Sequence, residues 1–414
     1  MSTATITHAP LLTSPWASTK QASHIAPCQF PIATPPLASF PLHNEEGVTY
    51  VGDTAGTVHY RFSFPKAGIV SIAPATIITL GGDVDQTRTV AHPVVTLQKQ
   101  KDGTWVGVAV YPVGLHKVLL FVDGRAVLTP LLPITCETNQ ELVNYIDVPP
   151  PDAKNCIYAM RPLMEHGSVA QDYVTSYTTN TVEEVLVYLP PSYHMAANAT
   201  RRYPVLYLLH NDGNNGQGSV QLGKVNVIAD NLIADGRMTD MIIVITNNAS
   251  TLCVNSSSDD ITQMCDDLTE EIIPYIDNRY RTKADRDHRA IAGLSMGSMQ
   301  ASRLSITRPD LFAYAGIFSG FLRTLWSGIG ADDDHMEVLR RDPAAYQSAM
   351  KVFFRCIGDE DMHMPRFEED DTILAELGVK CTRRIYKGPH SWHVWRQAAP
   401  EFLTVLFKSA YKWC

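Results

Sequence analysis

Short apolar runs that alternate with helical segments fill the second half of the chain, and this rhythm restricts the fold more than any other feature. Three of the runs, PVLYLLH, MIIVITN and RAIAGLS, occupy 204–210, 241–247 and 289–295. They are apolar on both faces of a strand, which is typical of parallel sheets covered by helices on both sides. Helical segments at 227–236 and 266–280 lie between them. The pattern predicts an α/β domain with a mostly parallel sheet.

The third of these runs leads into GLSMG, which holds a serine between Gly293 and Gly297. A helical segment follows and stops before Pro309. Many ordinary turns contain Gly-x-Ser-x-Gly, but its place between a buried strand and a helix predicts a nucleophile elbow that presents Ser295. We expect both positions to require glycine because the neighbouring backbone comes too close for a side chain. The backbone N–H of Met296, at the helix N-terminus, would face a developing oxyanion.

A serine hydroxyl needs a base, and the base needs a carboxylate that orients it. In α/β-hydrolases the acid and then the histidine follow the serine along the chain. The stretch VFFRCIGDED predicts a strand over 352–357 that ends in a turn with Asp359, Glu360 and Asp361. Further on, RRIYKGPHSWHVW predicts a strand, a Gly-Pro break and His390. These residues alone leave both aspartates open as the orienting acid.

Other histidines and polar residues near these loops have simpler interpretations. His393 falls among aromatic residues at the start of the closing helix, so we expect it to pack or to form part of a pocket wall. His363 shares the loop of the acid, but no further ligands occur at metal-binding spacing, so we expect neither a metal nor a cofactor. The backbone N–H groups of Asn211 and Asp212, after the strand at 204–210, are candidates for the second oxyanion donor.

Aromatic residues near the predicted site offer a wall for a substrate pocket. Trp326, Phe321 and Trp392 could line a pocket for an aryl acyl group or belong to the core. The sequence leaves these alternatives open.

The first part of the chain has a different organisation. Residues 1–45 are rich in proline and show no sustained periodicity, which indicates an extended arm. Short alternating strands with Asp-Gly turns fill 46–132 and predict a small all-β sandwich, with Trp105 at a core position. The stretch 133–165 contains VPPPDAKN and is interpreted as a linker, and 166–414 is the α/β domain.

Charge and the N-terminus restrict the partners. The formal net charge of −9 at pH 7 gives no electrostatic footprint for nucleic acid or an anionic membrane surface, so a small molecule is the expected partner.

The sequence shows neither a signal-peptide pattern at its start nor an apolar run of about 18 residues. The eight cysteines lack paired spacing. We therefore expect a cytoplasmic protein with free thiols, for which a homo-oligomer is compatible with the sequence.

Several blocks together resemble a known family. PVLYLLHNDG, AIAGLSMGSMQ, RPDLFAYAGIFSG and GPHSWHVWR are similar to the esterase D or carbohydrate esterase family 1 group, from about 166 to the C-terminus. The resemblance implies an α/β-hydrolase fold with Ser295 as nucleophile, His390 as base and Asp361 as orienting acid. It also implies a serine esterase that acts on acetyl or hydroxycinnamoyl (feruloyl) esters of plant-derived oligosaccharides. A siderophore esterase of the enterochelin type, or a catalytically silent carbohydrate-binding protein, are the alternatives.

The stretch DGTWVGVAVYPVGLHKVLLFVDGR is similar to the immunoglobulin-like module, related to carbohydrate-binding family 48, that often precedes such esterases. The chain departs from the family at three places. Asn211 stands after His210 where members have glycine, Ser298 replaces the last glycine of GLSMGG, and Pro389 replaces the second glycine of GGH. None of these departures removes Ser295, Asp361 or His390.

Overall fold

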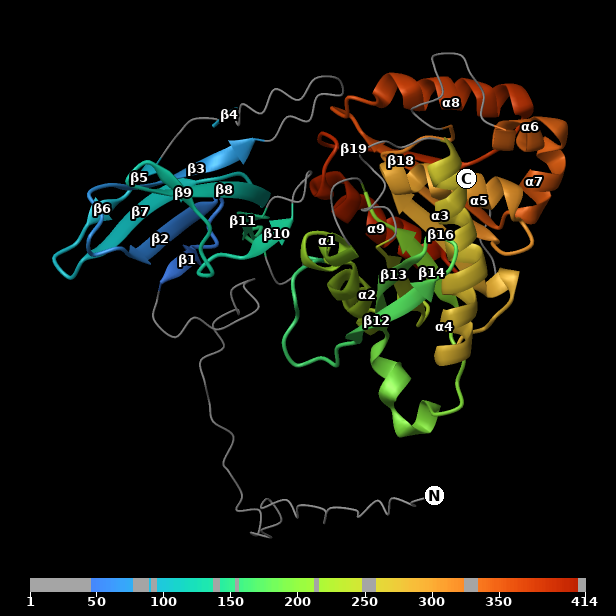
Figure 1. Cartoon of the computed structure of the whole chain (residues 1–414), viewed down its shortest axis with the longest axis horizontal. Helices are drawn as coiled ribbons and strands as arrows, with labels where there is room; N and C mark the ends of the chain where they lie inside the picture. Colours follow the sequence, from blue (N-terminus) through green and yellow to red (C-terminus); the bar gives the residue numbers. More distant parts are fainter. Residues whose placement is uncertain are drawn as a thin grey trace, which may run out of the picture.

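The computed structural model describes residues 46–76, 89–90, 95–136, 142–152, 156–211, 216–247, 258–323 and 334–408. The arm predicted for 1–45 lies outside these residues. Two antiparallel sheets come first in the chain, and a larger sheet flanked by helices follows (Figure 1). None of the described helices is long and apolar enough to cross a membrane.

The two N-terminal sheets pack face to face around one core. One has the order β1-β2-β7-β6, and the other follows β10-β11-β8-β3-β4, with β5 paired to β3 and β9 to β8. The strands are Gly47–Tyr50 (β1), Thr57–Ser63 (β2), Val70–Thr76 (β3), Thr89–Val90 (β4), Val95–Thr96 (β5), Gln98–Lys99 (β6), Thr104–Val110 (β7), Gly114–Val122 (β8), Arg125–Val127 (β9), Ile134–Cys136 (β10) and Leu142–Val148 (β11). The core includes Phe62, Trp105, Val118 and Ile146.

Trp105 lies in this core as predicted. Its side chain is only 4% exposed, and its indole N–H donates a hydrogen bond of 2.9 Å to the carbonyl oxygen of Phe64. A buried indole normally needs such a partner.

The prediction of a linker at 133–165 is wrong for its first half. β10 and β11 pair with each other, and β11 pairs with β8 from Asn144 opposite Val118 to Val148 opposite Gly114. Ile146 and Val148 are 0% and 1% exposed. The strand forms because its apolar side chains complete the N-terminal core, and the prolines that suggested a linker begin only after Val148. The sandwich therefore extends beyond its predicted end at residue 132.

The larger sheet carries the second half of the chain. Its order is β12-β13-β15-β14-β16-β17-β18-β19. β12 and β13 are antiparallel to their neighbours, whereas the strands from β15 to β19 run parallel. The predicted, mostly parallel sheet is confirmed. The strands are Ser168–Ser176 (β12), Thr181–Leu189 (β13), Val205–Leu209 (β14), Ile242–Thr246 (β15), Arg289–Leu294 (β16), Tyr314–Phe318 (β17), Val352–Gly358 (β18) and Thr382–Tyr386 (β19).

Helices cover both faces of this sheet. They are Gly216–Gln221 (α1), Val225–Ala234 (α2), Ser258–Asp267 (α3), Ile273–Arg279 (α4), Met296–Thr307 (α5), Asp334–Arg341 (α6), Pro343–Ala349 (α7), Met364–Leu377 (α8) and Trp392–Val405 (α9). The predicted helix at 266–280 begins earlier and passes through a π-helical turn at Leu268–Ile272. α2 and α9 pack on one face, and α3, α4 and α5 pack on the other.

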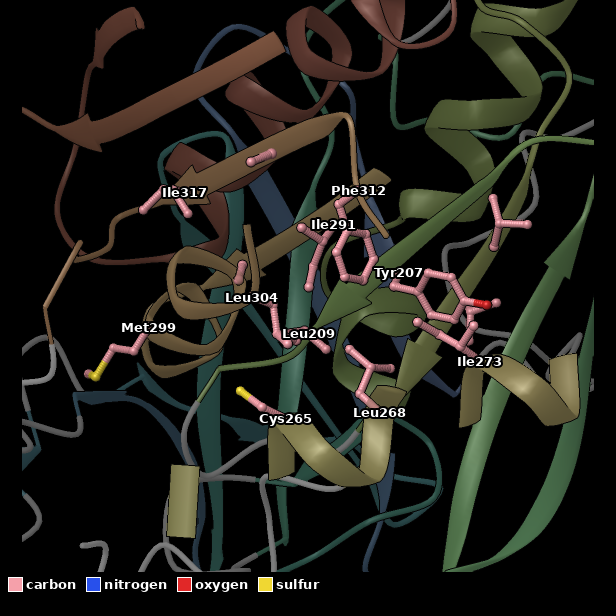
Figure 2. Close-up of a cluster of buried hydrophobic side chains, with 14 of the residues drawn as sticks. Tyr207, Leu209, Cys265, Leu268, Ile273, Ile291, Met299, Leu304, Phe312 and Ile317 are labelled. Carbon is pink, nitrogen blue, oxygen red and sulfur yellow. The ribbon is translucent and has the colours of Figure 1, made fainter. Parts of the chain in front are cut away.

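Figure 2 shows the core on the α5 side of the sheet. Leu209 of β14, Ile291 of β16 and Ile317 of β17 meet Leu304 of α5 there. Cys265 of α3 is part of the same cluster and is a buried free thiol, as are Cys156 and Cys356 elsewhere in the described chain. The two helical layers leave the carboxyl ends of the parallel strands together at one edge, which is where ligands bind in sheets of this kind.

Candidate active site

Ser295 occupies a sharp turn between β16 and α5. Its φ of 53° and ψ of −114° lie outside the regions that serine prefers, so the backbone is strained. The turn is held in place because the N–H of Ser295 donates to the carbonyl oxygen of Phe318 at 2.9 Å. The N–H and the hydroxyl of Ser298 both donate to the carbonyl oxygen of Ser295. Strain fixed in this way is typical of a nucleophile elbow.

The two glycines of the motif allow this turn to form. A Cβ atom at Gly293 would lie 1.9 Å from the carbonyl oxygen of Gly297. A Cβ atom at Gly297 would lie 2.6 Å from the carbonyl oxygens of Leu209 and His210. The prediction that backbone crowds both positions is confirmed. The contact at Gly297 also brings the start of α5 against the end of β14.

A continuous series of hydrogen bonds joins three side chains at this edge of the sheet. The Nε2 atom of His390 lies 2.8 Å from the Oγ atom of Ser295. The Nδ1 atom of His390 lies 2.8 Å from the Oδ2 atom of Asp361. A carboxylate can only accept, so Nδ1 carries the proton and Nε2 is free to accept the proton of the serine hydroxyl. The structure thus brings together the three residues that the sequence analysis named.

The environment of Asp361 keeps its carboxyl group ionised. Burial alone would raise its pKa, but the hydrogen bond and charge of His390 and the backbone N–H of His363 hold the pKa below its usual value. That N–H donates to Oδ1 of Asp361 at 3.0 Å. An ionised carboxylate behind the imidazole fixes its tautomer and stabilises the imidazolium form.

Asp359, the alternative acid, has a different position. Its Oδ1 atom accepts the backbone N–H of Gly388 at 2.8 Å, and its Oδ2 atom pairs with Nζ of Lys387 at 2.9 Å. Gly388 has a φ of 125° and begins the loop that carries His390. Asp359 therefore holds the histidine loop, whereas the carboxylate that contacts the imidazole is that of Asp361.

Of the predicted oxyanion donors, Met296 begins α5 and Asn211 follows the end of β14 by two residues. Met296 lies at the N-terminal end of this helix, the end that carries the positive partial charge of the helix dipole. Asn211 is buried, and its carbonyl oxygen accepts a hydrogen bond of 2.7 Å from Nδ1 of His210. Asp212 lies outside the described residues. Because a Cβ atom at Gly297 would lie 2.6 Å from the carbonyl oxygen of His210, the chain segments that contain Met296 and Asn211 come close to each other.

The site and the fold agree with a sequence comparison. The Esterase family model matches residues 176–404, which include all three hydrogen-bonded residues and more than half of the chain. The chain belongs to the Esterase family.

Curated relatives of this esterase are larger proteins. It is 29% identical over 377 residues to an endo-1,4-beta-xylanase/feruloyl esterase of Xylanibacter ruminicola, an alignment that covers 88% of this chain and 47% of that protein. It is 24% identical over 186 residues to endo-1,4-beta-xylanase Y of Acetivibrio thermocellus, which covers 42% of this chain and 16% of that protein. The aligned part thus spans less than half the length of these two relatives.

Solved structures show the same fold. A ferulic acid esterase superimposes with a TM-score of 0.52 and 26% identity, covering 59% of this chain and 99% of that one. The carbohydrate esterase family 1 ferulic acid esterase of Anaeromyces mucronatus superimposes with a TM-score of 0.51 and 20% identity, and the match covers 61% of this chain and 95% of that one. The enterobactin esterase FES of Shigella flexneri superimposes with a TM-score of 0.56 and 14% identity, and the match covers 85% of this chain and 93% of that one. At this identity the match shows a similar fold. The predicted α/β-hydrolase fold and the resemblance to carbohydrate esterase family 1 are confirmed.

The aromatic candidates for a substrate pocket are in different places. Trp326 lies outside the described residues, and Phe321 is 1% exposed within the core on the α5 side. Trp392 lines an apolar cavity of about 40 Å³ together with Leu294 and Phe318. The side chain of Trp392 is 7% exposed and packs edge-on against Trp395, with ring centroids 4.9 Å apart. Phe321 and Trp392 therefore contribute mainly to packing in the described structure.

Two rings beside His390 were not identified from the sequence. The ring of His363 lies edge-on to the ring of His390, with centroids 5.1 Å apart. The ring of Trp395, on α9, also lies edge-on to His390, with centroids 5.4 Å apart. Burial and the nearby His390 lower the pKa of His363. Both rings pack against the imidazole of His390. His393, in contrast, is exposed, so it is not packed in the core, and its role as a pocket wall stays a prediction.

The same region offers a donor set for a metal ion. One ligand atom each from Asp361, His363 and His390 lies within 4.8 Å of the others. Asp361 and both nitrogens of His390 are already used in the hydrogen bonds to each other and to Ser295. A metal ion would have to break this series of hydrogen bonds, so the geometry fits proton transfer better than metal binding.

Proposed function

We propose that this esterase is a serine carboxylic-ester hydrolase in which Ser295, His390 and Asp361 form a catalytic triad. The observation that carries the proposal is the unbroken series of two 2.8 Å hydrogen bonds from the strained Ser295 through His390 to the buried Asp361. Positioned base catalysis of this kind contributes about 10²–10⁴ in rate.

The reaction proceeds through an acyl-enzyme. Oγ of Ser295 attacks the carbonyl carbon of the ester while Nε2 of His390 takes the hydroxyl proton. Asp361 holds the Nδ1 proton and stabilises the imidazolium. The backbone N–H of Met296 and a donor at Asn211 or Asp212 stabilise the oxyanion, each donor contributing about 2.7–4 kcal/mol. His390 then gives its proton to the leaving alkoxide, and water repeats the sequence to release the acid and restore Ser295.

The substrate class follows from the relatives. We infer that the esterase acts on acetyl or hydroxycinnamoyl (feruloyl) esters of plant-derived oligosaccharides. Support comes from the relative named xylanase/feruloyl esterase, whose alignment covers 88% of this chain, and from the ferulic acid esterase that is 26% identical. The two N-terminal sheets would then be the immunoglobulin-like module that the sequence predicts.

A siderophore esterase is the second candidate. The likeness to enterobactin esterase covers 85% of this chain and so extends into the N-terminal sheets. A triscatecholate ester is its expected substrate.

A fluorophosphonate probe tests the triad directly. We expect it to label the wild-type protein and Ser348→Ala, whose serine is exposed on α7, and not Ser295→Ala. Hydrolysis of 4-nitrophenyl acetate should follow the same pattern. Labelling or turnover in the folded Ser295→Ala variant would contradict the proposal.

Substrate choice requires a second assay. Turnover of methyl ferulate, an acetylated xylo-oligosaccharide and a ferric triscatecholate ester should be compared at equal concentrations of titrated sites. Preference for either of the first two supports the oligosaccharide ester proposal. Preference for the triscatecholate supports the second candidate.

A further inference from the structure

Helix α9 connects the N-terminal sheets to the catalytic histidine. In Figure 1 it lies on the side of the α/β unit that faces those sheets. It contacts β8 there, and α1 beside it contacts β10. α9 begins at Trp392, two residues after His390. A shift of the first turns of α9 would therefore also shift the loop that carries His390.

A buried ion pair joins the two parts of the chain at this helix. Nη1 and Nη2 of Arg396, on α9, donate to the two carboxylate oxygens of Asp147, on β11, at 2.9 and 2.8 Å. Asp147 is 1% exposed and Arg396 is 3% exposed. The geometry is bidentate, with two parallel bonds between planar groups, so it fixes both the distance and the orientation of the arginine.

The remaining contacts of both residues leave little freedom. Nε of Arg396 donates to the carbonyl oxygen of Leu222 at 2.6 Å, and the guanidinium lies 4.8 Å from the ring centre of Tyr158. The backbone N–H of Asp147 donates to the hydroxyl of Tyr50 at 3.0 Å. Burial lowers the pKa of Lys224, and the charge of Asp147 opposes that effect. Asp147 therefore balances positive charge in a region that excludes water.

The chain neighbour of Arg396 reaches the catalytic histidine. Trp395 lies edge-on to His390 with centroids 5.4 Å apart, and edge-on to Trp392 at 4.9 Å. Successive side chains on a helix point about 100° apart, so one turn of α9 presents Arg396 to the N-terminal sheets and Trp395 to His390. Gly223, next to Leu222, completes the packing because a Cβ atom there would lie 2.6 Å from the Trp392 ring.

We propose that Asp147 is a positioning residue for His390 and acts through Arg396 and the first turns of α9. The N-terminal sheets are then part of the catalytic unit. This inference rests on the proposed function, since it concerns the base of the same reaction. A buried ion pair is often no more stabilising than apolar residues of the same volume, whereas it does specify one geometry. A base displaced by about 1 Å can lose about 10²-fold in rate, so such specification matters at His390.

Two variants test the inference. Asp147→Asn keeps the shape of the side chain and removes the charge that balances Arg396. Arg396→Lys keeps the charge and removes the bidentate geometry. The matched control is Asp235→Asn, which breaks the bidentate pair of Asp235 with Arg161 at 2.6 and 3.2 Å, at the end of α2.

The kinetic measurement uses kcat and KM for 4-nitrophenyl acetate per fluorophosphonate-titrated site. We expect both test variants to lose about tenfold or more in kcat, with KM within about twofold, because the base and not the binding surface is displaced. Asp235→Asn should keep its kcat. Unchanged kcat per titrated site in both variants, with only a lower melting temperature, would reduce the ion pair to a stabilising role and overturn the inference.

A spectroscopic measurement separates this inference from the proposed function. The Nδ1 proton between His390 and Asp361 should give a downfield proton resonance that Asp361→Asn removes. We expect Asp147→Asn and Arg396→Lys to shift or broaden it and Asp235→Asn to leave it in place. If the wild type hydrolyses no ester while this pattern holds, the proposed function fails and the positioning role stands. An unperturbed resonance in both test variants overturns the positioning role whatever the turnover.

Discussion

The Oδ1 atom of Asp359 accepts a hydrogen bond of 2.8 Å from the backbone N–H of Gly388, so the turn after β18 holds the loop that carries His390. Two residues further on, Asp361 contacts the imidazole itself at 2.8 Å. Two aspartates of one turn therefore have separate tasks. One fixes the loop and the other fixes the ring.

The first prediction distinguishes these two tasks. Asp361→Asn should lower kcat by up to about 10⁴-fold, because an amide in place of the carboxylate favours the wrong imidazole tautomer. Asp359→Asn should stay close to the wild type, since the amide oxygen still accepts the N–H of Gly388. Steady-state kinetics on 4-nitrophenyl acetate checks both. A larger loss in Asp359→Asn would move the orienting role to Asp359.

The second prediction concerns stability in acid. The pKa of Asp361 is lowered in the folded protein, so near pH 4 the unfolded state binds more protons and the free energy of unfolding rises with pH. The contribution of Asp361 is complete above its unfolded pKa of about 3.9 and is lost as the pH falls through the lower folded value. Urea unfolding between pH 3 and pH 6 should show the difference between wild type and Asp361→Asn shrinking below about pH 4. A constant difference would contradict the prediction.

The third prediction addresses the elbow. Gly293→Ala should lose about 4 kcal/mol or more of unfolding free energy, or fail to fold, because its Cβ atom would lie 1.9 Å from a backbone oxygen that cannot move aside. The control is Gly378→Asn at the end of α8, where φ is 69° and nothing lies within 4 Å of the new Cβ atom. Asparagine tolerates that conformation, so the control should change stability by less than about 1 kcal/mol. Equal stability of the two variants, measured by urea unfolding, would argue against the crowding.

The fourth prediction assigns Trp105 to the core of the N-terminal sheets. Trp105→Ala should lower the free energy of unfolding by about 3–5 kcal/mol, because it leaves a cavity in the core and removes the hydrogen bond of the indole N–H to the carbonyl oxygen of Phe64. Val108→Ala, 55% exposed on the same strand, should change it by about 0.5 kcal/mol or less. A variant at Trp105 that kept its stability and lost affinity for xylo-oligosaccharides would instead make this residue part of a sugar site.

Some sequence-based expectations stay predictions. These are the cytoplasmic location, the homo-oligomer, and the predicted domain boundaries other than the one at residue 132. Trp326 and Asp212 lie outside the described residues, so their roles also stay predictions.

The sequence by itself determined the parallel sheet, the turn at Ser295 and the need for Gly293 and Gly297. These features depend on short-range patterns, since apolar runs specify buried strands and a glycine pair specifies a close backbone approach. The same reasoning predicted Trp105 in the core, because alternation along a strand is also local.

Only the tertiary structure showed that Asp361 contacts the imidazole of His390 while Asp359 holds its loop, placed Phe321 in the core and put β10 and β11 in the first half of the predicted linker. The hydrogen bonds that decide the site join residues 29 and 95 positions apart, and the ion pair of Asp147 with Arg396 spans 249 positions. Contacts of this length leave no periodic signal in a single sequence. They exist because the sheet and α9 bring the partners together, and burial then makes each unpaired charge too costly to tolerate.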